Sequence, residues 1–350
     1  MNRQGKGGAA TDIDIVVTWV DGNDPAWRAR KAQVTGEGVS DDREDRYRDW
    51  DLMRYWFRGI ERFAPWARKV FFVCGQEPPA WLDPACGKLE IVRHEDFIPE
   101  RFLPTFSSHP IELNMHRIPG LGELFIYFND DMFLTAPVRE ERFFRMSLPR
   151  DSALLNPVPT MDLAGKTDAR IFTIPLNNVS YINRDYAFRA CVKTHPLKWL
   201  NARYGKSFLR NLMLMSWPRF VGFDEPHLPQ AYLKSSFEKA WEEDGDILEE
   251  TCSHAIRNDR DVNPWMIRER QLAEGCFVPV KPVRDAVFDL GKNAEGAAAA
   301  IRGQQKPMVC LEDGPMDRER FEQIRALLRA AFEEILPGRS MFEKEGSGEA

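Results

Sequence analysis

The stretch from Leu124 to Leu134, LFIYFNDDMFL, decides how this chain is expected to fold. Its first five residues form a dense apolar run, which is typical of a central strand covered on both faces. The run ends at Asn129, Asp130 and Asp131 and then resumes. Two adjacent carboxylates at the end of a buried strand are costly unless a cation meets them, so a metal ion carrying a phosphate is one interpretation. A solvated turn between two strands is the other, because Asn and Asp are ordinary turn residues.

Strand and helix patterns surround this stretch. Residues 13–20, IDIVVTWV, are rich in β-branched side chains and are expected to form a strand that ends in an acidic turn. Further strands are expected at 69–74 and 89–92, with a helix over 52–63. The alternation indicates an α/β fold with a mixed, mostly parallel sheet of Rossmann or GT-A-like type, flanked by helices. In such sheets, ligands bind beyond the carboxyl ends of the strands.

The second half of the chain is mainly helical in its patterning and is expected to pack on this sheet. Residues 292–305, KNAEGAAAAIRGQQ, are low in complexity and are expected to form a mobile loop. The expected division is a disordered N-terminus over 1–11, an α/β half over 12–146, a mainly helical half over 147–291 that completes the site, the loop over 292–305, a strand and helix returning to the core over 306–344, and a disordered tail over 345–350.

Bulk composition excludes several classes of protein. The 350 residues carry a net charge of −6, so no global basic field indicates nucleic acid as a partner. No apolar run reaches the roughly 18 residues of a transmembrane span, and the N-terminus lacks the apolar core of a secretory signal. We therefore expect a cytoplasmic protein, either free or in peripheral contact with the inner face of the membrane. The six cysteines are scattered without a CxxC motif, which argues against a structural zinc site or a disulfide framework.

A second group of polar residues lies in the helical half. His254, Arg257 and Asp261 are spaced three and four apart, so on a helix they would share one face. A salt-bridged solvent face is the ordinary explanation of such spacing. The alternative is a site in which a histidine and an arginine act together.

The order of several blocks resembles the Stealth family, the sugar-1-phosphate transferases of bacterial capsule synthesis, which also includes the catalytic part of the animal enzyme that phosphorylates lysosomal glycans. DIDIVVTWVDGNDPAW at 12–27 is similar to the first family block, and residues 46–138, which contain HRIPG and FNDDMF, resemble the second. Looser similarity covers 225–263, and residues 306–344 resemble the last block.

The resemblance implies a specific reaction. The donor would be a UDP-sugar, bound by the α/β half, and the acceptor a hydroxyl of an oligosaccharide or polysaccharide, either free or lipid-linked. A hexose 1-phosphate, for example an N-acetylhexosamine 1-phosphate, would move to that hydroxyl and form a phosphodiester in a capsular or other cell-surface polysaccharide. UMP would leave.

Phosphoryl transfer depends on positioning and charge neutralisation, and a diphosphate needs a divalent ion. Asp130 and Asp131 are the expected ligands of Mg²⁺ or Mn²⁺, and both can bind one ion only if the strand has ended before them. His254 is the expected general base, with Asp131 as its rival. Arg257 is expected to grip a phosphate oxygen with its planar guanidinium.

Further residues are expected to bind the substrates. Arg48 and Arg117 are additional phosphate candidates, while His116 and His227 would orient sugar hydroxyls. The remaining expected contacts of the nucleotide or the sugar are Trp19, Asp21, Gly22, Asp49, Asn114, Asn129 and Asp261.

Two alternatives from other classes remain open at this stage. A metal-dependent, GT-A-like glycosyltransferase would use the same acidic motif and release UDP instead of UMP. A non-catalytic carbohydrate-binding protein would use the ten tryptophans as stacking platforms.

Overall fold

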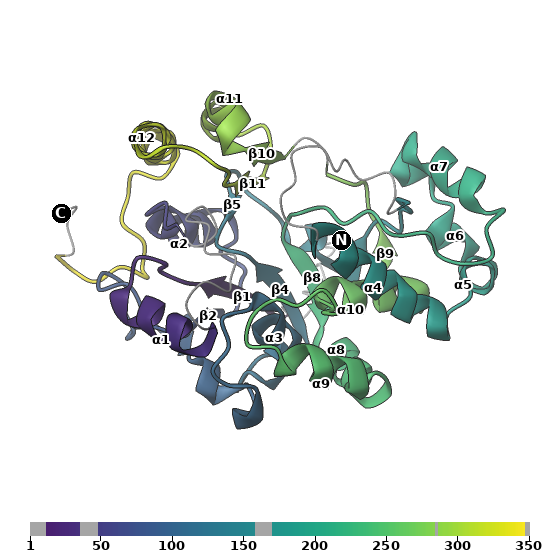
Figure 1. The fold of residues 1–350 in the computed structure, drawn as a ribbon. Helices are drawn as coiled ribbons and strands as arrows, with labels where there is room; N and C mark the ends of the chain where they lie inside the picture. Colours follow the sequence, from purple (N-terminus) through teal and green to yellow (C-terminus); the bar gives the residue numbers. More distant parts are fainter. Residues whose placement is uncertain (1–11, 36–47, 158–169, 284–285, 347–350) are drawn as a thin grey trace, which may run out of the picture.

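A five-stranded sheet forms the centre of the protein, which we describe from a computed structural model covering residues 12–35, 48–157, 170–283 and 286–346 (Figure 1). Its strand order is β3-β2-β1-β4-β8, and only β8 runs antiparallel to its neighbour. The expected mixed, mostly parallel α/β sheet is confirmed. The strands are β1 (Ile13–Trp19), β2 (Val70–Cys74), β3 (Leu89–Val92), β4 (Leu124–Phe128) and β8 (Gln230–Leu233).

Alternate residues of the central strands pack into two separate cores. In β1, Ile15 and Val17 lie in one core and Val16 lies in the other. In β4, Phe125 and Ile126 are divided between the two cores in the same way, and both are fully buried. This division explains the continuous apolar runs of the sequence, because a strand covered on both faces needs apolar side chains in both directions.

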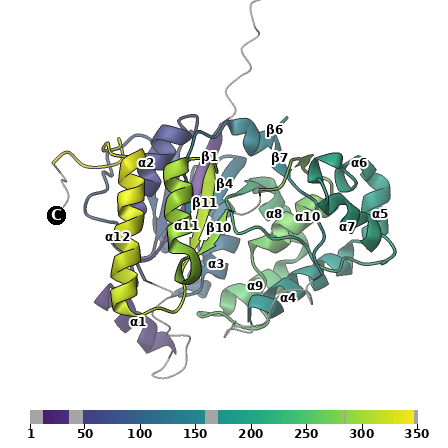
Figure 2. The same cartoon turned by 90° about the horizontal axis from the view of Figure 1, so that it is seen from above.

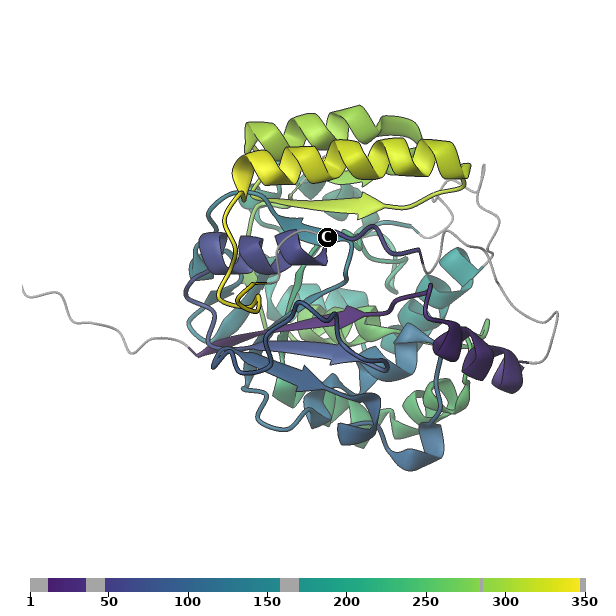
Figure 3. The same ribbon diagram turned by 90° about the vertical axis from the view of Figure 1, so that its left-hand side faces the viewer.

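One face of the sheet is covered by α2 (Met53–Phe63), beyond which lies a small three-stranded sheet. Helices α11 (Leu290–Gly303) and α12 (Arg318–Ile335) lie side by side above the small sheet (Figure 3). Gly59 of α2 allows a close approach, since a Cβ there would lie 3.0 Å from the carbonyl oxygen of Leu134. The small sheet has the order β10-β11-β5, with β10 (Val287–Asp289), β11 (Met308–Glu312) and β5 (Met132–Leu134).

The stretch over residues 170–273 covers the other face, as Figures 1 and 2 show. It is mainly helical, as expected, but it also contributes β8 to the main sheet. A third small sheet has the order β6-β7-β9, with β6 (Phe144–Arg145), β7 (Leu148–Asp151) and β9 (Val278–Pro279). The remaining helices are α1 (Pro25–Thr35), α3 (Ser108–Leu113), α4 (Arg170–Asp185), α5 (Phe188–Thr194), α6 (Pro196–Trp199), α7 (Ser207–Leu214), α8 (Lys234–Glu243), α9 (Gly245–Ser253) and α10 (Pro264–Ala273). Short 3-10 turns occur at His94–Asp96, Glu100–Phe102, Met115–Arg117, Glu140–Arg142 and Ala202–Tyr204.

The order of the main sheet predicts where a ligand binds. The chain builds outward from β1 to β2 and β3, and then returns to place β4 on the other side of β1. Strands β1 and β4 are parallel, with Val17 opposite Phe128. Their carboxyl ends therefore meet at the point where the strand order reverses, which is the usual ligand position in open α/β sheets. The acidic turn after β1 and the NDD turn after β4 both lie there.

The expectation of a mobile loop over 292–305 was wrong, because α11 occupies most of that range. Ala294, Ala297, Ala298 and Ile301 recur at helical spacing and are buried. Alanine is the best helix former, so the low-complexity run is the small-residue face of a helix packed closely on α12. The expected disorder of residues 1–11 falls outside the described residues, as do the last four residues of the expected tail.

A buried ion pair attaches the C-terminal segment to α2. Glu343 accepts hydrogen bonds from Arg58 Nε at 2.9 Å and Arg58 Nη2 at 3.1 Å, and only 1% of its side chain is exposed. We predict that Glu343→Ala lowers the free energy of unfolding by about 3–5 kcal/mol, because it leaves the Arg58 guanidinium buried without this partner. Urea denaturation measures the change. The matched Glu345→Ala, at a fully exposed carboxylate, is expected to stay within about 0.5 kcal/mol of the wild type, and equal stability of the two variants would contradict the assignment.

Candidate active site

The NDD motif forms a turn beyond the end of the central strand. Strand β4 ends at Phe128, and the Met132 backbone N–H donates to the Asn129 carbonyl at 3.2 Å across the turn. Successive side chains of a strand point to opposite faces, but Asp130 and Asp131 lie beyond the end of the strand. Both can therefore approach one ligand. Asp130 is exposed and Asp131 is half-buried.

Strand β11 and the loop before β8 bring further groups to Asp131. The Cys310 thiol donates to Asp131 Oδ2 at 3.4 Å, and His227 Nε2 lies 3.9 Å from the same oxygen. On the other side of its ring, His227 Nδ1 lies 3.1 Å from Glu312 Oε1. Residues 310 and 312 are two apart on β11, so both side chains face the histidine.

The electrostatics of this group are dominated by desolvated negative charge. Burial, followed by the charges of Asp131 and Asp49, raises the pKa of Asp130 to about 7. Burial also raises the pKa of Asp49 to about 6, with Asp21 contributing. Burial alone would lower the pKa of His227, but the charges of Asp131 and Glu312 outweigh it and raise the pKa to about 9.

The protonation of His227 also determines how the side-chain amide of Asn129 is oriented. His227 Nε2 lies 3.0 Å from the amide of Asn129, and an imidazolium must donate there. The amide oxygen of Asn129 therefore has to face the ring.

Two ligand sets for a metal ion can be drawn from these residues. Asp131, His227 and Cys310 bring three donor atoms within 4.8 Å of one another, a mixed set that suits softer ions. Asp130, Asp131 and nearby Asp49 offer carboxylate oxygens alone, which suit Mg²⁺. Metal binding by the first set would require His227 and Cys310 each to lose a proton, and their surroundings raise the pKa of both, so we favour the second set. The buried Asp131 Oδ1 has no hydrogen-bond partner among the described residues, so it is available as a ligand.

A second group of polar side chains is centred on the buried carboxylate of Asp261. His254 Nδ1 lies 2.7 Å from Asp261 Oδ1, and His109 Nδ1 lies 3.0 Å from Asp261 Oδ2. The backbone N–H of Asn258 donates to Asp261 Oδ2 at 2.9 Å. Donation by Nδ1–H leaves Nε2 of His254 as its basic nitrogen, and about a quarter of the side chain is exposed. This is the arrangement of a histidine that a carboxylate orients as a general base.

His254, Arg257 and Asp261 do come together, but not on a helix as the spacing suggested. Helix α9 ends at Ser253, and the following residues form a loop up to α10. The loop is fixed from both sides, since the Phe106 backbone N–H donates to Ala255 O at 2.7 Å and Asn177 donates to Asp261 O at 2.9 Å. Hydrogen bonds within the loop replaced the helical ones, which residue spacing alone cannot reveal.

Helix α3 connects the two groups. Its His109 belongs to the Asp261 group, and its Glu112, one turn further on, accepts a hydrogen bond from the Tyr127 hydroxyl at 2.9 Å. Tyr127 is the penultimate residue of β4. The charge of Glu112 acts on the pKa of both His109 and His227, so this buried carboxylate lies between the two groups. Arg257 joins from the loop by donating to Ser108 Oγ at 3.0 Å.

The turn after β1 lies at the same edge of the sheet. Gln76, which follows β2, accepts from the Asp21 backbone N–H at 2.7 Å and donates to the Asp21 carbonyl at 2.8 Å. The ring of Trp19 packs on Phe72 with centroids 5.6 Å apart, and Gly22 is buried in the turn. These contacts fix Trp19 and Asp21 at this edge, and the charge of Asp21 acts on Asp49 of the acidic group.

Four of the expected substrate-binding residues are engaged elsewhere. Arg48 forms a two-pronged ion pair with Asp313, with both N···O distances 3.0 Å. The His116 ring stacks on Phe237, and burial lowers its pKa to about 3. The other two also make structural contacts: the fully buried Asn114 donates to Pro110 O at 2.8 Å, and Arg117 donates to Asn114 Oδ1 at 3.0 Å.

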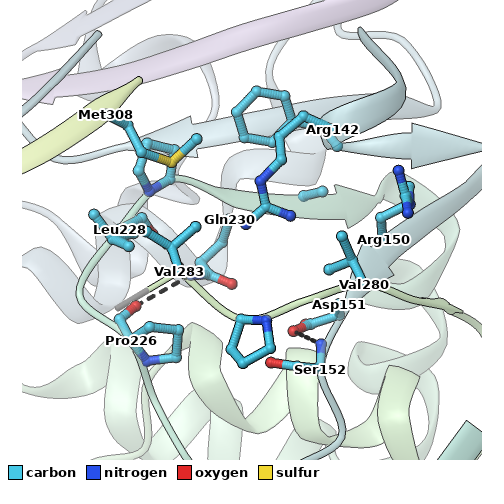
Figure 4. Close-up of a pocket in the computed structure, with 14 residues that line it drawn as sticks. Arg142, Arg150, Asp151, Ser152, Pro226, Leu228, Gln230, Val280, Val283 and Met308 are labelled. Atoms are coloured by element: carbon cyan, nitrogen blue, oxygen red, sulfur yellow. Dashed lines mark hydrogen bonds between the residues drawn. The ribbon is translucent and has the colours of Figure 1, made fainter. Parts of the chain in front are cut away.

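A pocket with a volume of about 40 Å³ lies beside the segment that carries His227 (Figure 4). Pro226 and Leu228, which flank the histidine, line it together with Met308, two residues before Cys310. The Arg142 side chain reaches into its middle and Arg150 lies at its edge. The full lining is Arg142, Phe143, Arg150, Asp151, Ser152, Pro226, Leu228, Pro229, Gln230, Ala231, Val280, Pro282, Val283 and Met308.

The lining of this pocket is electropositive. Its one carboxylate, Asp151, is already paired with the buried Arg268 through contacts of 2.6 and 2.8 Å. The Arg142 guanidinium has no hydrogen-bond or ion-pair partner within the described parts of the chain, and Nε of Arg150 is buried without one. Burial and the neighbouring arginines Arg145 and Arg203 lower the pKa of Arg150. Such a pocket can take an oxyanion.

Sequence reasoning missed Tyr127, Glu112, Cys310 and Glu312 as parts of the site. The period of two along the predicted last strand would have placed residues 310 and 312 on one face. What could not be read is the antiparallel pairing of Cys310 with Met132, because it joins segments almost 180 residues apart. The pocket with Arg142 was also missed, since its lining comes from five separate segments.

Comparison with known proteins finds relatives along almost the whole chain. Residues 11–39 match the Stealth protein CR1 conserved region 1, and residues 46–150 match the Stealth protein CR2 conserved region 2. The chain is 34% identical over 336 residues to the capsular polysaccharide phosphotransferase WcwK of Streptococcus pneumoniae, covering 95% of this chain and 98% of that protein. It is 36% identical to the exopolysaccharide phosphotransferase cps2G of Lactiplantibacillus plantarum (95% and 96% covered) and 37% identical to the receptor polysaccharide phosphotransferase WefC of Streptococcus oralis (95% and 99%).

The chain therefore belongs to the Stealth family, and the expected enzyme class, a phosphotransferase, is confirmed. Among the helices that the structure describes, none combines the length and the apolar character needed to cross a membrane.

The charged histidine supplies a test of the acidic group. In metal-free protein, we predict that the ring of His227 titrates near pH 9, measured by NMR, and that Glu312→Gln lowers this pKa. Because the folded-state pKa lies above the ordinary value of about 6.5, the ion pairs stabilise the fold fully below that pH, and their contribution is lost as the pH rises through about 9. The exposed Glu319→Gln serves as the charge control. A wild-type midpoint near 6.5 would show that the assigned ion pairs do not form.

Proposed function

We propose that this enzyme transfers a hexose 1-phosphate from a UDP-sugar to a hydroxyl of a cell-surface or capsular polysaccharide, free or lipid-linked, and releases UMP. The observation that supports this most is that the protein has both an acidic group, Asp130 and Asp131, where the strand order reverses, and a histidine, His254, that a carboxylate orients. Phosphoryl transfer needs both, because the diphosphate must be neutralised and the attacking hydroxyl must lose its proton. The cytoplasm, where UDP-sugars are made, is the proposed location.

The acidic group would take the donor. Asp130 and Asp131 are the proposed ligands of Mg²⁺ or Mn²⁺, with Asp49 close by, and a bound ion would neutralise the diphosphate. Protonated His227 is a further cation at this edge, positioned by Glu312 and Asp131. Trp19, Asp21 and Gly22 would contact the nucleotide at the end of β1, in keeping with ligand positions in this type of sheet.

The Asp261 group would activate the acceptor. His254 Nε2 accepts the proton of the acceptor hydroxyl as its oxygen attacks the β-phosphorus of the donor. The bond from that phosphorus to the oxygen bridging the two phosphates breaks, and UMP departs with that oxygen. Asp261 is a positioning residue, since its bond to Nδ1 holds the ring in the tautomer in which Nε2 is the proton-accepting nitrogen and stabilises the imidazolium after the step. Arg257 would bind a non-bridging phosphate oxygen with its guanidinium.

The basic pocket next to His227 would hold an anionic group of the acceptor. Its volume of about 40 Å³ has room for about three water-sized molecules, which suits one carboxylate or phosphate but not a whole sugar ring. The apolar part of the lining, Leu228, Val280 and Val283, would shield this ion pair from water and strengthen it. Acceptors that carry phosphate or uronic acid are the classes that this chemistry favours.

The division of roles is tested by isosteric variants. His254→Gln and Asp131→Asn are each expected to lower kcat by about 10²–10⁴-fold, because each removes a proton acceptor or a charge while keeping the shape of the side chain. UMP release from a panel of UDP-hexoses with Mg²⁺, followed by mass spectrometry, is the measurement. His195→Gln, at a histidine outside both groups, is expected to keep wild-type turnover. Near-normal turnover in His254→Gln would remove that residue as the base.

The acceptor pocket is tested by direct binding. Glucose 6-phosphate, titrated calorimetrically into metal-free protein, is expected to bind about tenfold more weakly to Arg142→Gln, because one charge-assisted hydrogen bond is lost. Arg145→Gln changes the same charge three residues further along the chain, outside the pocket lining, and is expected to bind as the wild type does. Equal weakening by both variants would show that only the overall positive charge of this region attracts the anion. Unchanged binding in Arg142→Gln would show that the anion does not bind in the pocket. A parallel titration with glucuronate separates phosphate from carboxylate as the preferred group.

A further inference from the structure

One end of the molecule carries an unusual surface, formed by helices α5, α6 and α7 and the segments that join them (Figures 1 and 2). We call residues 186–223 the basic lobe, because this stretch contains seven Lys or Arg residues and no Asp or Glu, although the whole chain has a net charge of −6. The seven cations are Arg189, Lys193, Lys198, Arg203, Lys206, Arg210 and Arg219. Such a local excess, in an acidic protein, indicates a surface that meets negative charge.

Helix α7 in this lobe presents apolar side chains outward as well as inward, where Phe208 and Leu214 pack on the core. Asn211 is 1% exposed and donates to Ala153 O at 2.6 Å and to Trp199 O at 3.0 Å. On the opposite side, Leu209, Leu212 and Met213 are 56%, 49% and 78% exposed. A surface helix ordinarily presents polar side chains to water, so an outward apolar face of this kind indicates a surface that something apolar covers.

The apolar surface continues beyond α7. Leu197 of α6 is 79% exposed, and Trp217, in the turn after α7, is 56% exposed. Of the ten large apolar residues that are exposed in the described parts of the chain, five lie within residues 197–217. Tryptophan next to aliphatic side chains is typical of proteins that lie at the boundary of lipid headgroups and acyl chains.

The cations around this apolar surface remain available. Lys193, Arg203 and Lys206 are exposed, and their side chains make no ion pair with any residue that the structure describes. Arg189 and Arg219 are also exposed and donate to backbone carbonyl oxygens, of Ser216 and Asn183, which leaves their charges uncompensated. Exposed apolar side chains among uncompensated cations match an anionic lipid surface in both respects: the apolar groups enter the bilayer and the cations meet the headgroup phosphates.

We propose that the basic lobe docks on the surface of a membrane that contains anionic lipid, with Leu209, Leu212, Met213 and Trp217 at the headgroup boundary. The lobe adjoins the basic pocket next to His227, since Arg203 acts electrostatically on Arg150 and the Tyr204 hydroxyl accepts from the Ala153 backbone N–H at 3.2 Å. Docking in this way would bring the acceptor side of the enzyme close to the lipid surface. The docking itself does not depend on which reaction the enzyme catalyses.

Vesicle cosedimentation with the full chain tests the proposal. At about 0.1 M salt, the protein is expected to bind vesicles of phosphatidylcholine and phosphatidylglycerol (3:1) and not vesicles of phosphatidylcholine alone. The double variant Met213→Ser/Trp217→Ser is expected to weaken partitioning at least tenfold, because it removes two large apolar side chains from the boundary. Lys193→Gln and Lys206→Gln are each expected to weaken it about fivefold, and added salt should weaken binding further.

Matched variants outside the lobe complete the test. Met341→Ser, at another exposed methionine, and Arg139→Gln, at another exposed cation, are expected to partition as the wild type does. Absence of binding to the anionic vesicles, or equal binding by the wild type and the Met213→Ser/Trp217→Ser variant, would overturn the proposal. So would a lipid-free dimer, seen by analytical ultracentrifugation, that the same double variant dissociates, because the surface would then belong to a second copy. Release of UMP from a UDP-sugar is measured separately, so failure of docking is not confused with failure of the proposed reaction.

Discussion

The rest of the site depends on negative charge that is concentrated at the reversal of the strand order. Asp130 and Asp131 follow a strand that is buried on both faces, with Asp49 close by, and burial is the first cause of the raised pKa of all three. Such a group is unfavourable in isolation and becomes favourable when a cation arrives. The protein supplies one cation itself, the imidazolium of His227, and leaves carboxylate oxygens to bind more.

Helix α3 connects this charge to the group around His254, the proposed general base. Glu112 and His109 lie one turn apart on that short helix, so one buried face of the helix contacts both Tyr127 at the end of β4 and Asp261 in the loop after α9. A single rigid element thereby sets the distance between the group that would neutralise the donor and the group that would deprotonate the acceptor. Precise positioning of this kind is the larger part of catalysis in phosphoryl transfer, where the protein does little covalent chemistry.

Much of the fold could be predicted because, in the first half of the chain, the residue pattern of each strand already indicates how that strand is buried in the sheet. The β-branched run of β1 and the apolar run of β4 each identify a strand. Once the two strands are taken as parallel neighbours, their carboxyl ends, and with them both acidic turns, must lie at the same edge of the sheet.

The loop at 254–261 and helix α11 were mispredicted for a common reason, because the conformation of each depends on the segments that pack against it. Spacing suggested a helix where hydrogen bonds to Phe106 and Asn177 hold a loop, and low complexity suggested a loop where α12 provides a surface for alanines. Of the expected site residues, those at strand ends lie at one edge of the sheet, whereas Asn114, His116 and Arg117 make structural contacts that residue type and spacing did not reveal.

The central claim, that the bond broken lies between the two phosphates of the donor, is tested most directly by following the β-phosphorus. A UDP-sugar labelled at that atom with ³²P is incubated with the enzyme, a divalent cation and an acceptor polysaccharide, and the label is then located. Phosphoryl transfer predicts that the label enters the polysaccharide together with the sugar, in equal amounts, while unlabelled UMP accumulates. Label recovered in UDP, with sugar alone in the polysaccharide, would contradict the account and make the enzyme a glycosyltransferase.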